Sequence, residues 1–167
     1  MIVFHTSETQ FSPHQFHPLS HFGSASAAYA RVQSDHHAYL YMGILRLHRP
    51  LTIRDFGNES HMLAHDLHKQ KILDRNTYQK IRENKPSGFN TQSLIHYLQS
   101  QGHDGLSYDN SAEDIGSTSH IIFSPQQFIP LGPPIEFTPP KISLREFTQD
   151  MNHMAQQRLT QSLTKAA

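Results

Sequence analysis

The chain has 167 residues, with 36% hydrophobic and 17% charged residues, which is enough to bury the core of one domain. Its 14 basic and 14 acidic residues cancel, so the composition argues against a strong general affinity for polyanions such as nucleic acids. The absence of cysteine excludes disulfides, a thiolate nucleophile and a thiolate zinc site.

The N-terminal residues show neither a basic flank nor a long apolar segment. A cleaved signal peptide and a membrane-spanning helix are therefore not expected, and we expect no membrane partner. The sequence predicts a protein that works in the cytoplasm, either of its own cell or of a target cell.

The first predicted strand is Ile2–Phe4, and it ends on the polar side chains of His5, Thr6 and Ser7. A proline- and histidine-rich loop follows, and its aromatic residues Phe11 and Phe16 are expected to pack beneath it. Ser24 or Ser26 then caps a helix predicted to run to Gln33. The polar end of the strand could carry function, although a histidine that only caps a turn gives the same pattern.

The longest predicted strand is Tyr39–Leu47, whose two faces are both apolar, as in a central strand that is covered on both sides. After the proline break, residues 49–53 continue as an edge strand or a second short strand. Residues 58–84 are predicted to be helical with a solvated basic face, and Asn90 caps a further helix over 91–101.

Two short strands with a polar loop between them are predicted between Gly102 and Phe128. The strands are Leu106–Tyr108 and Ser119–Phe123, and the loop carries Glu113 and Asp114. A carboxylate held between two anchored strands is well placed for chemistry, because loops on a rigid scaffold often carry catalytic groups.

The C-terminal part differs in composition from the rest. We expect one domain over residues 1–131, a proline-rich linker over 132–141, and an amphipathic helix over 142–167 that begins with capping-box spacing at Ser143 and Glu146. The apolar stripe of this helix either docks on the domain or contacts a partner or a second copy.

Several motifs, taken together, resemble those of small ADP-ribosyltransferase domains of the His-aromatic-Glu type. Such domains occur in phage polyvalent proteins, anti-CRISPR proteins and secreted bacterial effectors. The matching motifs are Phe4-His5-Thr6-Ser7, the spaced Phe11 and Phe16, His21-Phe22-Gly23-Ser24 with Ala27-Ala28, Gly102-x-Asp104-Gly105, Tyr108-x-Asn110-x-x-Glu113 and Ile122-Phe123-x-Pro125-x-Gln127.

The resemblance implies an α+β fold with a split, mixed and antiparallel β-sheet core, peripheral helices and a C-terminal helix. It also implies a mono-ADP-ribosyltransferase that cleaves NAD at the nicotinamide–ribose bond. The ADP-ribose would pass to a macromolecular acceptor, with a protein favoured, as in a toxin, an effector or a phage-type inhibitor. No metal is needed for this chemistry.

The resemblance also assigns roles to individual residues. Breaking the nicotinamide–ribose bond builds positive charge on the sugar, which a fixed carboxylate stabilises, and Glu113 is the implied catalytic residue, with Asp114 as its neighbouring alternative. The NAD-binding residues implied are His5 at the adenosine-side ribose, Thr6 and Ser7 at the nicotinamide end, His21 or Phe22 as the stacking surface, and Tyr108 and Ser119 in the wall.

Two positions depart from the commoner motifs. Thr6 stands where glycine is usual after the histidine, and His21-Phe22 stands where a tyrosine is expected, unless Tyr29 turns into the site. These departures affect the assignment of the stacking surface more than the reaction class.

The 14 histidines suggest a metal-binding protein as an alternative. His61, His65 and His68 are spaced to share one helix face, and His14, His17 and His21 are also close together. A catalytically silent interaction module on the same fold is a third possibility. An RNA-directed phosphotransferase of similar fold is disfavoured by the lack of a basic surface.

Overall fold

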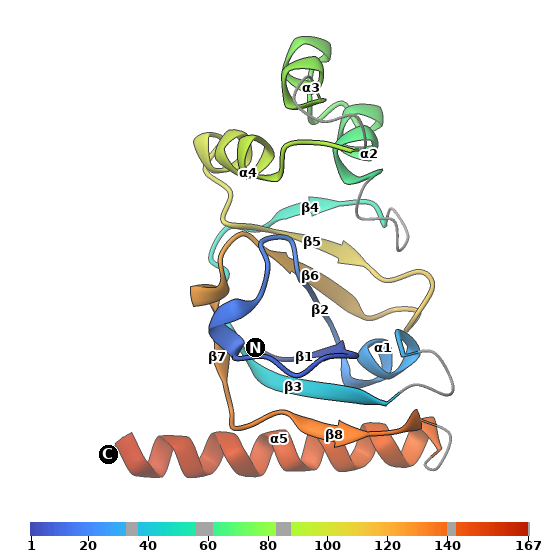
Figure 1. The fold of residues 1–167 in the computed structure, drawn as a ribbon, viewed down its shortest axis with the longest axis vertical. Coiled ribbons are helices and arrows are strands. Elements are labelled where there is room, and N and C mark those ends of the chain that lie inside the picture. The colour runs from blue at the N-terminus through green and yellow to red at the C-terminus, as the bar shows by residue number, and fades with distance from the viewer. Residues whose placement is uncertain (33–36, 56–61, 83–87, 140–142, 167) are drawn as a thin grey trace.

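The computed structural model describes residues 1–32, 37–55, 62–82, 88–139 and 143–166. Within these ranges the chain forms two four-stranded sheets with helices around them, which confirms the predicted α+β class (Figure 1).

The first sheet is organised around β3 (Ala38–Leu45), which pairs antiparallel with β1 (Ile2–Ser7), β7 (Phe128–Pro130) and β8 (Ile135–Phe137). Most of β3 is buried, as the apolar character of both its faces predicts. At Gly43 an added Cβ would lie 2.3 Å from the ring of Phe128, so this crossing of β3 and β7 requires glycine.

The second sheet has the order β2 (His21–Phe22), β6 (Thr118–Ile122), β5 (Gly105–Asp109) and β4 (Leu51–Ile53). The pairs β2–β6 and β5–β6 are antiparallel, whereas β4 and β5 are parallel. The two sheets are joined where Phe4 and Gly23 exchange backbone hydrogen bonds of 2.9 and 3.0 Å. This junction brings the middle of β1 next to the end of β2.

Helices α1 (Ala25–Ala30), α2 (Leu63–Lys69), α3 (Arg75–Arg82) and α4 (Thr91–Ser100) surround the sheets, and single turns form at η1 (Pro13–Gln15) and η3 (Pro125–Gln127). The predicted caps are present. Ser24 Oγ accepts from the Ala27 amide at 3.0 Å, and Asn90 Oδ1 accepts from the Ser93 amide at 3.0 Å.

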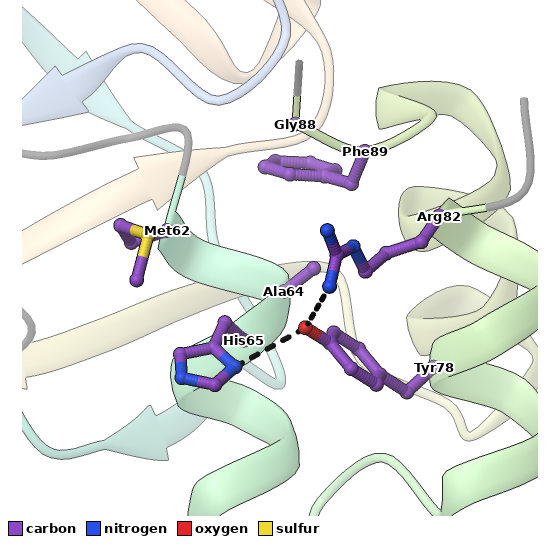
Figure 2. Close-up of a pocket in the computed structure, with 7 residues that line it drawn as sticks. All are labelled: Met62, Ala64, His65, Tyr78, Arg82, Gly88 and Phe89. Atoms are coloured by element: carbon purple, nitrogen blue, oxygen red, sulfur yellow. Dashed lines mark hydrogen bonds between the residues drawn. The ribbon is translucent and has the colours of Figure 1, made fainter. Parts of the chain in front are cut away.

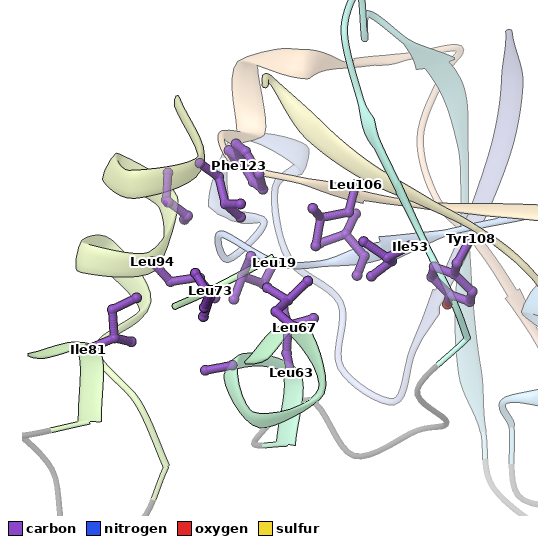
Figure 3. Close-up of a cluster of buried hydrophobic side chains, with 14 residues drawn as sticks. Leu19, Ile53, Leu63, Leu67, Leu73, Ile81, Leu94, Leu106, Tyr108 and Phe123 are labelled. Atoms are coloured by element: carbon purple, nitrogen blue, oxygen red, sulfur yellow. The ribbon is translucent and has the colours of Figure 1, made fainter. Parts of the chain in front are cut away.

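The buried hydrophobic side chains form three clusters. One cluster packs the second sheet against α2, α3 and α4, with Leu67, Leu94 and Ile121 fully buried (Figure 3). A second cluster, which includes Phe16, Phe22, Tyr41 and Phe128, fills the space between the sheets, and a third lies between the first sheet, α1 and α5. The chain thereby covers both faces of the first sheet.

The segment expected to be a linker over 132–141 takes part in the first sheet, because it contains β8. The C-terminal helix α5 (Leu144–Ala166) packs back on this sheet, with Phe147 and Ala155 only 2% and 0% exposed. Docking on the domain is thus what the apolar stripe of α5 does. Within the described ranges, no helix combines the length and apolar character that a membrane span requires.

Candidate functional site

Polar side chains from three separate parts of the chain meet where β2, the end of α1 and the loop between β5 and β6 approach each other. They connect through hydrogen bonds and one ion pair. The residues of this cluster, called the β2–α1 site below, are His21, Arg31, Tyr108, Asn110, Glu113 and Ser119.

Asn110 organises the loop that carries Glu113. Its side chain is 2% exposed, and its Oδ1 accepts from the backbone amides of Ala112, Glu113 and Asp114 at 3.1, 2.8 and 3.3 Å. Its Nδ2 donates to Glu113 Oε2 at 2.8 Å and to Ser119 Oγ at 3.1 Å. One amide therefore fixes both the backbone and the carboxylate of Glu113.

Arg31, directly after α1, faces the carboxylate of Glu113 with two nitrogens. Its Nε lies 2.8 Å from Oε1 and its Nη2 lies 3.0 Å from Oε2, and the side chains of Arg31 and Glu113 are 26% and 8% exposed. The same Nη2 donates to the hydroxyl of Tyr108 at 3.0 Å. Both charges of the site are thus partly withdrawn from water and paired.

Arg31 belongs to none of the sequence motifs. The available signal is an arginine that ends an alanine-rich helix, and such residues are usually solvent-exposed. Only the return of the chain 82 residues later gives Arg31 its partner.

His21 lies beside Tyr108, with 2.9 Å between Nδ1 and the tyrosine hydroxyl. Burial, and then the positive charge of Arg31, lower the pKa of His21 to about 3. The imidazole is therefore neutral at pH 7, and Arg31 is the positive charge of the cluster. Burial raises the pKa of Tyr108, so its phenol stays protonated and can donate.

His5 lies next to the β2–α1 site, and its side chain contacts the backbone of His21. Its Nδ1 is 2.7 Å from the carbonyl oxygen of His21, which requires Nδ1 to carry a proton and donate. The ring contacts Phe16 and Phe22 at centroid distances of 4.9 and 5.3 Å, and burial lowers its pKa to about 4. His5 thus positions β2 rather than capping an isolated turn.

The other residues of the first motif make local contacts. Thr6 Oγ1 donates to the carbonyl of Ala28 at 2.8 Å, which ties β1 to α1, and the Ser7 hydroxyl accepts from the Thr9 amide at 3.2 Å. Neither residue has a contact with the Glu113 carboxylate among the described hydrogen bonds.

Phe22 does not form the expected stacking surface. Its side chain is 1% exposed and packs on Phe128 and Phe16, with centroids 5.0 Å away in both cases. Phe22 belongs to the core because β2 turns this residue toward the space between the sheets. Tyr29 does not replace it, since its hydroxyl donates to the Pro139 carbonyl at 2.7 Å and its ring packs on Phe147. Of the two alternatives, His21 is at the β2–α1 site.

Asp114, the alternative to Glu113, faces another group. Its Oδ2 accepts from the Ser24 hydroxyl at 2.5 Å, and Ser24 is the N-cap of α1. Asp114 therefore anchors the loop to α1, whereas Glu113 faces Arg31 and Asn110.

Two of the histidines expected as possible metal ligands, His65 and His68, have other contacts. The rings of His65 and His68 lie against Tyr78, and His68 Nδ1 is 2.8 Å from the Leu73 carbonyl oxygen. His61 lies outside the described residues. No group of three possible metal ligands occurs in the described part of the chain.

No protein-family model, curated protein or solved structure matches this chain. The chemical groups of the β2–α1 site are thus the guide to its function. They comprise a carboxylate, a guanidinium, a neutral imidazole and a phenol, all held by backbone or side-chain hydrogen bonds.

Proposed function

We propose that this protein is a mono-ADP-ribosyltransferase that cleaves NAD between nicotinamide and ribose and transfers ADP-ribose to a macromolecular acceptor. The observation that carries the proposal is the placement of Glu113. Its side chain is 8% exposed and lies on the loop between β5 and β6, where Asn110 and Arg31 hold it. Arg31 also donates to Tyr108, whose hydroxyl lies beside the neutral His21, and His5 contacts the backbone of His21. A held, water-poor carboxylate is what a reaction through a cationic sugar requires.

In the proposed reaction, the bond between ribose C1′ and the nicotinamide nitrogen breaks, and its electron pair leaves with neutral nicotinamide. The positive charge that develops on the ribose is stabilised by the Glu113 carboxylate. A nucleophile of the acceptor then forms the new bond to C1′ and gives up its proton to Glu113 or to water. We favour a protein acceptor, because the net charge of zero gives no general attraction to nucleic acids.

Arg31 has a defined part in this proposal. Its guanidinium lies against both carboxylate oxygens of Glu113, 2.8 Å from Oε1 and 3.0 Å from Oε2. The pyrophosphate of NAD carries negative charge that competes for the same guanidinium, so substrate binding would free the carboxylate for the ribose. His21 would offer its uncharged ring to nicotinamide, and Tyr108 and Ser119 would form the adjoining wall.

The test is incubation of the purified protein with labelled NAD and a cell lysate, followed for macromolecular label and for free nicotinamide. Wild type and Asp114→Asn should both give product, because Asp114 contacts Ser24, while Glu113→Gln should lose at least about a hundredfold in rate. Equal rates for wild type and Glu113→Gln would refute the role of Glu113. Loss in Asp114→Asn alone would move catalysis to Asp114.

A second candidate is a catalytically silent binding module, and the Arg31–Glu113 ion pair favours it, since a carboxylate that stays paired with Arg31 cannot reach a sugar. The same incubation separates the two. A folded wild type that gives neither label nor nicotinamide supports the silent module.

A further inference from the structure

A cavity away from the β2–α1 site is lined by residues of α2, of α3 and of the segment that leads into α4 (Figure 2). Its volume is about 280 Å³, slightly below the roughly 300 Å³ at which common ligand pockets begin. A cavity of this volume can hold a molecule of about one ring and one small substituent. The described lining residues are Met62, Ala64, His65, Tyr78, Arg82, Gly88 and Phe89.

The polar side of the cavity is built around the hydroxyl of Tyr78. Arg82 Nη1 donates to this oxygen at 3.1 Å, and His65 Nδ1 lies 3.1 Å from it (Figure 2). His68 stacks on the Tyr78 ring at 4.6 Å with nearly parallel planes, and its own Nδ1 is fixed by the Leu73 carbonyl. Contacts to its ring and to its hydroxyl thus fix Tyr78, and the hydroxyl in turn positions the guanidinium of Arg82.

The remaining walls are apolar. Ala64 is buried, and Tyr78 and Phe89 both pack against the hydrophobic core beneath the second sheet. In the view of Figure 2 the Arg82 guanidinium lies between the side chains of Phe89 and Tyr78, and Met62 is at the other rim. Flat rings and a thioether suit a flat, apolar body.

Among the described residues that line the cavity, the side chain with a permanent charge is that of Arg82. Arg82 carries a permanent positive charge, and no acidic side chain is among the described residues that line the cavity. A guanidinium with five donors, of which one is used on Tyr78, has donors left for the oxygens of a carboxylate or phosphate. An anion at this point would also lie within reach of His65.

We propose that this cavity is a binding site for a small aromatic anion, with a carboxylate or phosphate on Arg82 and a flat ring against Phe89. The site requires both parts of the ligand, because the guanidinium selects the anion and the apolar walls select the ring. The proposal does not depend on NAD chemistry, since none of its residues belongs to the β2–α1 site.

The test is a titration of the ¹⁵N-labelled full chain with phenyl phosphate and with benzoate, followed by amide chemical shifts. We expect saturable shifts at Ala64, Tyr78 and Phe89 with a dissociation constant of roughly a millimolar or lower. Whichever of the two probes binds more tightly identifies the anion. Inorganic phosphate and benzyl alcohol, which each carry one half of the ligand, should bind at least about tenfold more weakly.

The variants separate the site from general charge effects. Arg82→Gln should weaken binding of the aromatic anions about tenfold or more. Lys80→Gln, which removes an exposed positive charge of the same helix outside the cavity, should leave binding unchanged. Should Arg82→Gln fail to fold by circular dichroism, Phe89→Leu tests the other half, since it keeps an apolar wall but removes the ring and should weaken both aromatic probes.

Three results would overturn the proposal. The first is a folded wild type that shows no saturable shifts with either aromatic anion. The second is equal binding by Arg82→Gln and Lys80→Gln. The third is inorganic phosphate binding as tightly as phenyl phosphate, which would mean a plain anion contact.

Discussion

Arg31 and Glu113 pair through two contacts, Nε to Oε1 at 2.8 Å and Nη2 to Oε2 at 3.0 Å, although they are 82 residues apart in the sequence. Arg31 ends the helix that packs on β1, and Glu113 lies on the loop between two strands of the second sheet. The pair therefore joins the two halves of the fold at the proposed catalytic carboxylate.

We expect Arg31→Ala to lower the free energy of unfolding by about 1–2 kcal/mol, because Glu113 is nearly buried and loses its counter-charge. Arg145→Ala, at an exposed position of α5, is the matched control and should change it by less than about 0.5 kcal/mol. Urea unfolding of Arg31→Ala, Glu113→Ala and the double variant should give a coupling energy of about 1 kcal/mol. Strict additivity would show that the pair contributes nothing to stability.

Asn110 offers a separate test of how Glu113 is positioned. Asn110→Ala removes three acceptor contacts and two donor contacts of a 2% exposed side chain, so we expect a loss of about 1–3 kcal/mol. Asn110→Asp keeps the acceptor for the loop amides but places a second carboxylate 2.8 Å from Glu113 Oε2.

Both variants should therefore lose NAD cleavage, and Asn110→Asp should do so while retaining more of the loop structure. The measurements are urea unfolding and free nicotinamide. Ser111→Ala, in the next position but bonded to Asp55, controls for general effects on this loop. Wild-type nicotinamide release by folded Asn110→Asp would contradict the positioning role.

Local sequence signals predict much of this fold. The caps at Ser24 and Asn90 follow from side-chain chemistry within three residues, and the strand pair around Glu113 follows from β-forming residues and turns. The central position of β3 follows from its two apolar faces. Such features depend on neighbours in the sequence, which a pattern can describe.

The features that a pattern does not predict depend on distant pairing. Arg31 gains its partners Tyr108 and Glu113 from a distant part of the chain, and Phe22 is buried because β2 pairs with β6 in one register. Ile135–Phe137 lies in a proline-rich segment, and it forms β8 because the edge of β3 opposite β1 is open at Ala38–Leu40, before the residues that pair with β7. None of these contacts can be derived from residues that are adjacent in the chain.

We expect His5 and His21 to make the stability of the fold sensitive to acid. Burial lowers the pKa of His5 to about 4 and, together with the charge of Arg31, that of His21 to about 3, while an unfolded histidine titrates near 6.5. At a pH between the folded-state pKa of each histidine and about 6.5, the unfolded chain binds more protons than the folded chain. The free energy of unfolding therefore falls as the pH drops below about 6.5. His120, whose pKa burial also lowers, contributes in the same direction.

We expect about 2 kcal/mol of stability to be lost between pH 7 and pH 5, after a discount of about half for partial exposure of both rings. Urea unfolding at the two pH values measures it. His21→Gln keeps a polar side chain beside Tyr108 but cannot be protonated, so its loss should be smaller by about 1 kcal/mol. An unchanged pH dependence in this variant would assign the effect to other groups.

The docking of the C-terminal helix α5 on the first sheet can be tested by its effect on stability. Phe147 is 2% exposed and packs on Tyr29 and Phe137, each at a ring-centroid distance of 4.9 Å. Phe147→Ala should lower the free energy of unfolding by about 3 kcal/mol, because the cavity it leaves opens onto β8 and α1. Leu163→Ala, at a position of α5 that is 64% exposed, should change it by less than about 0.5 kcal/mol. If the two variants unfold at the same urea concentration, α5 does not dock on the first sheet. Its apolar stripe is then free for a partner or a second copy. Sedimentation of the wild type would reveal a second copy as a dimer.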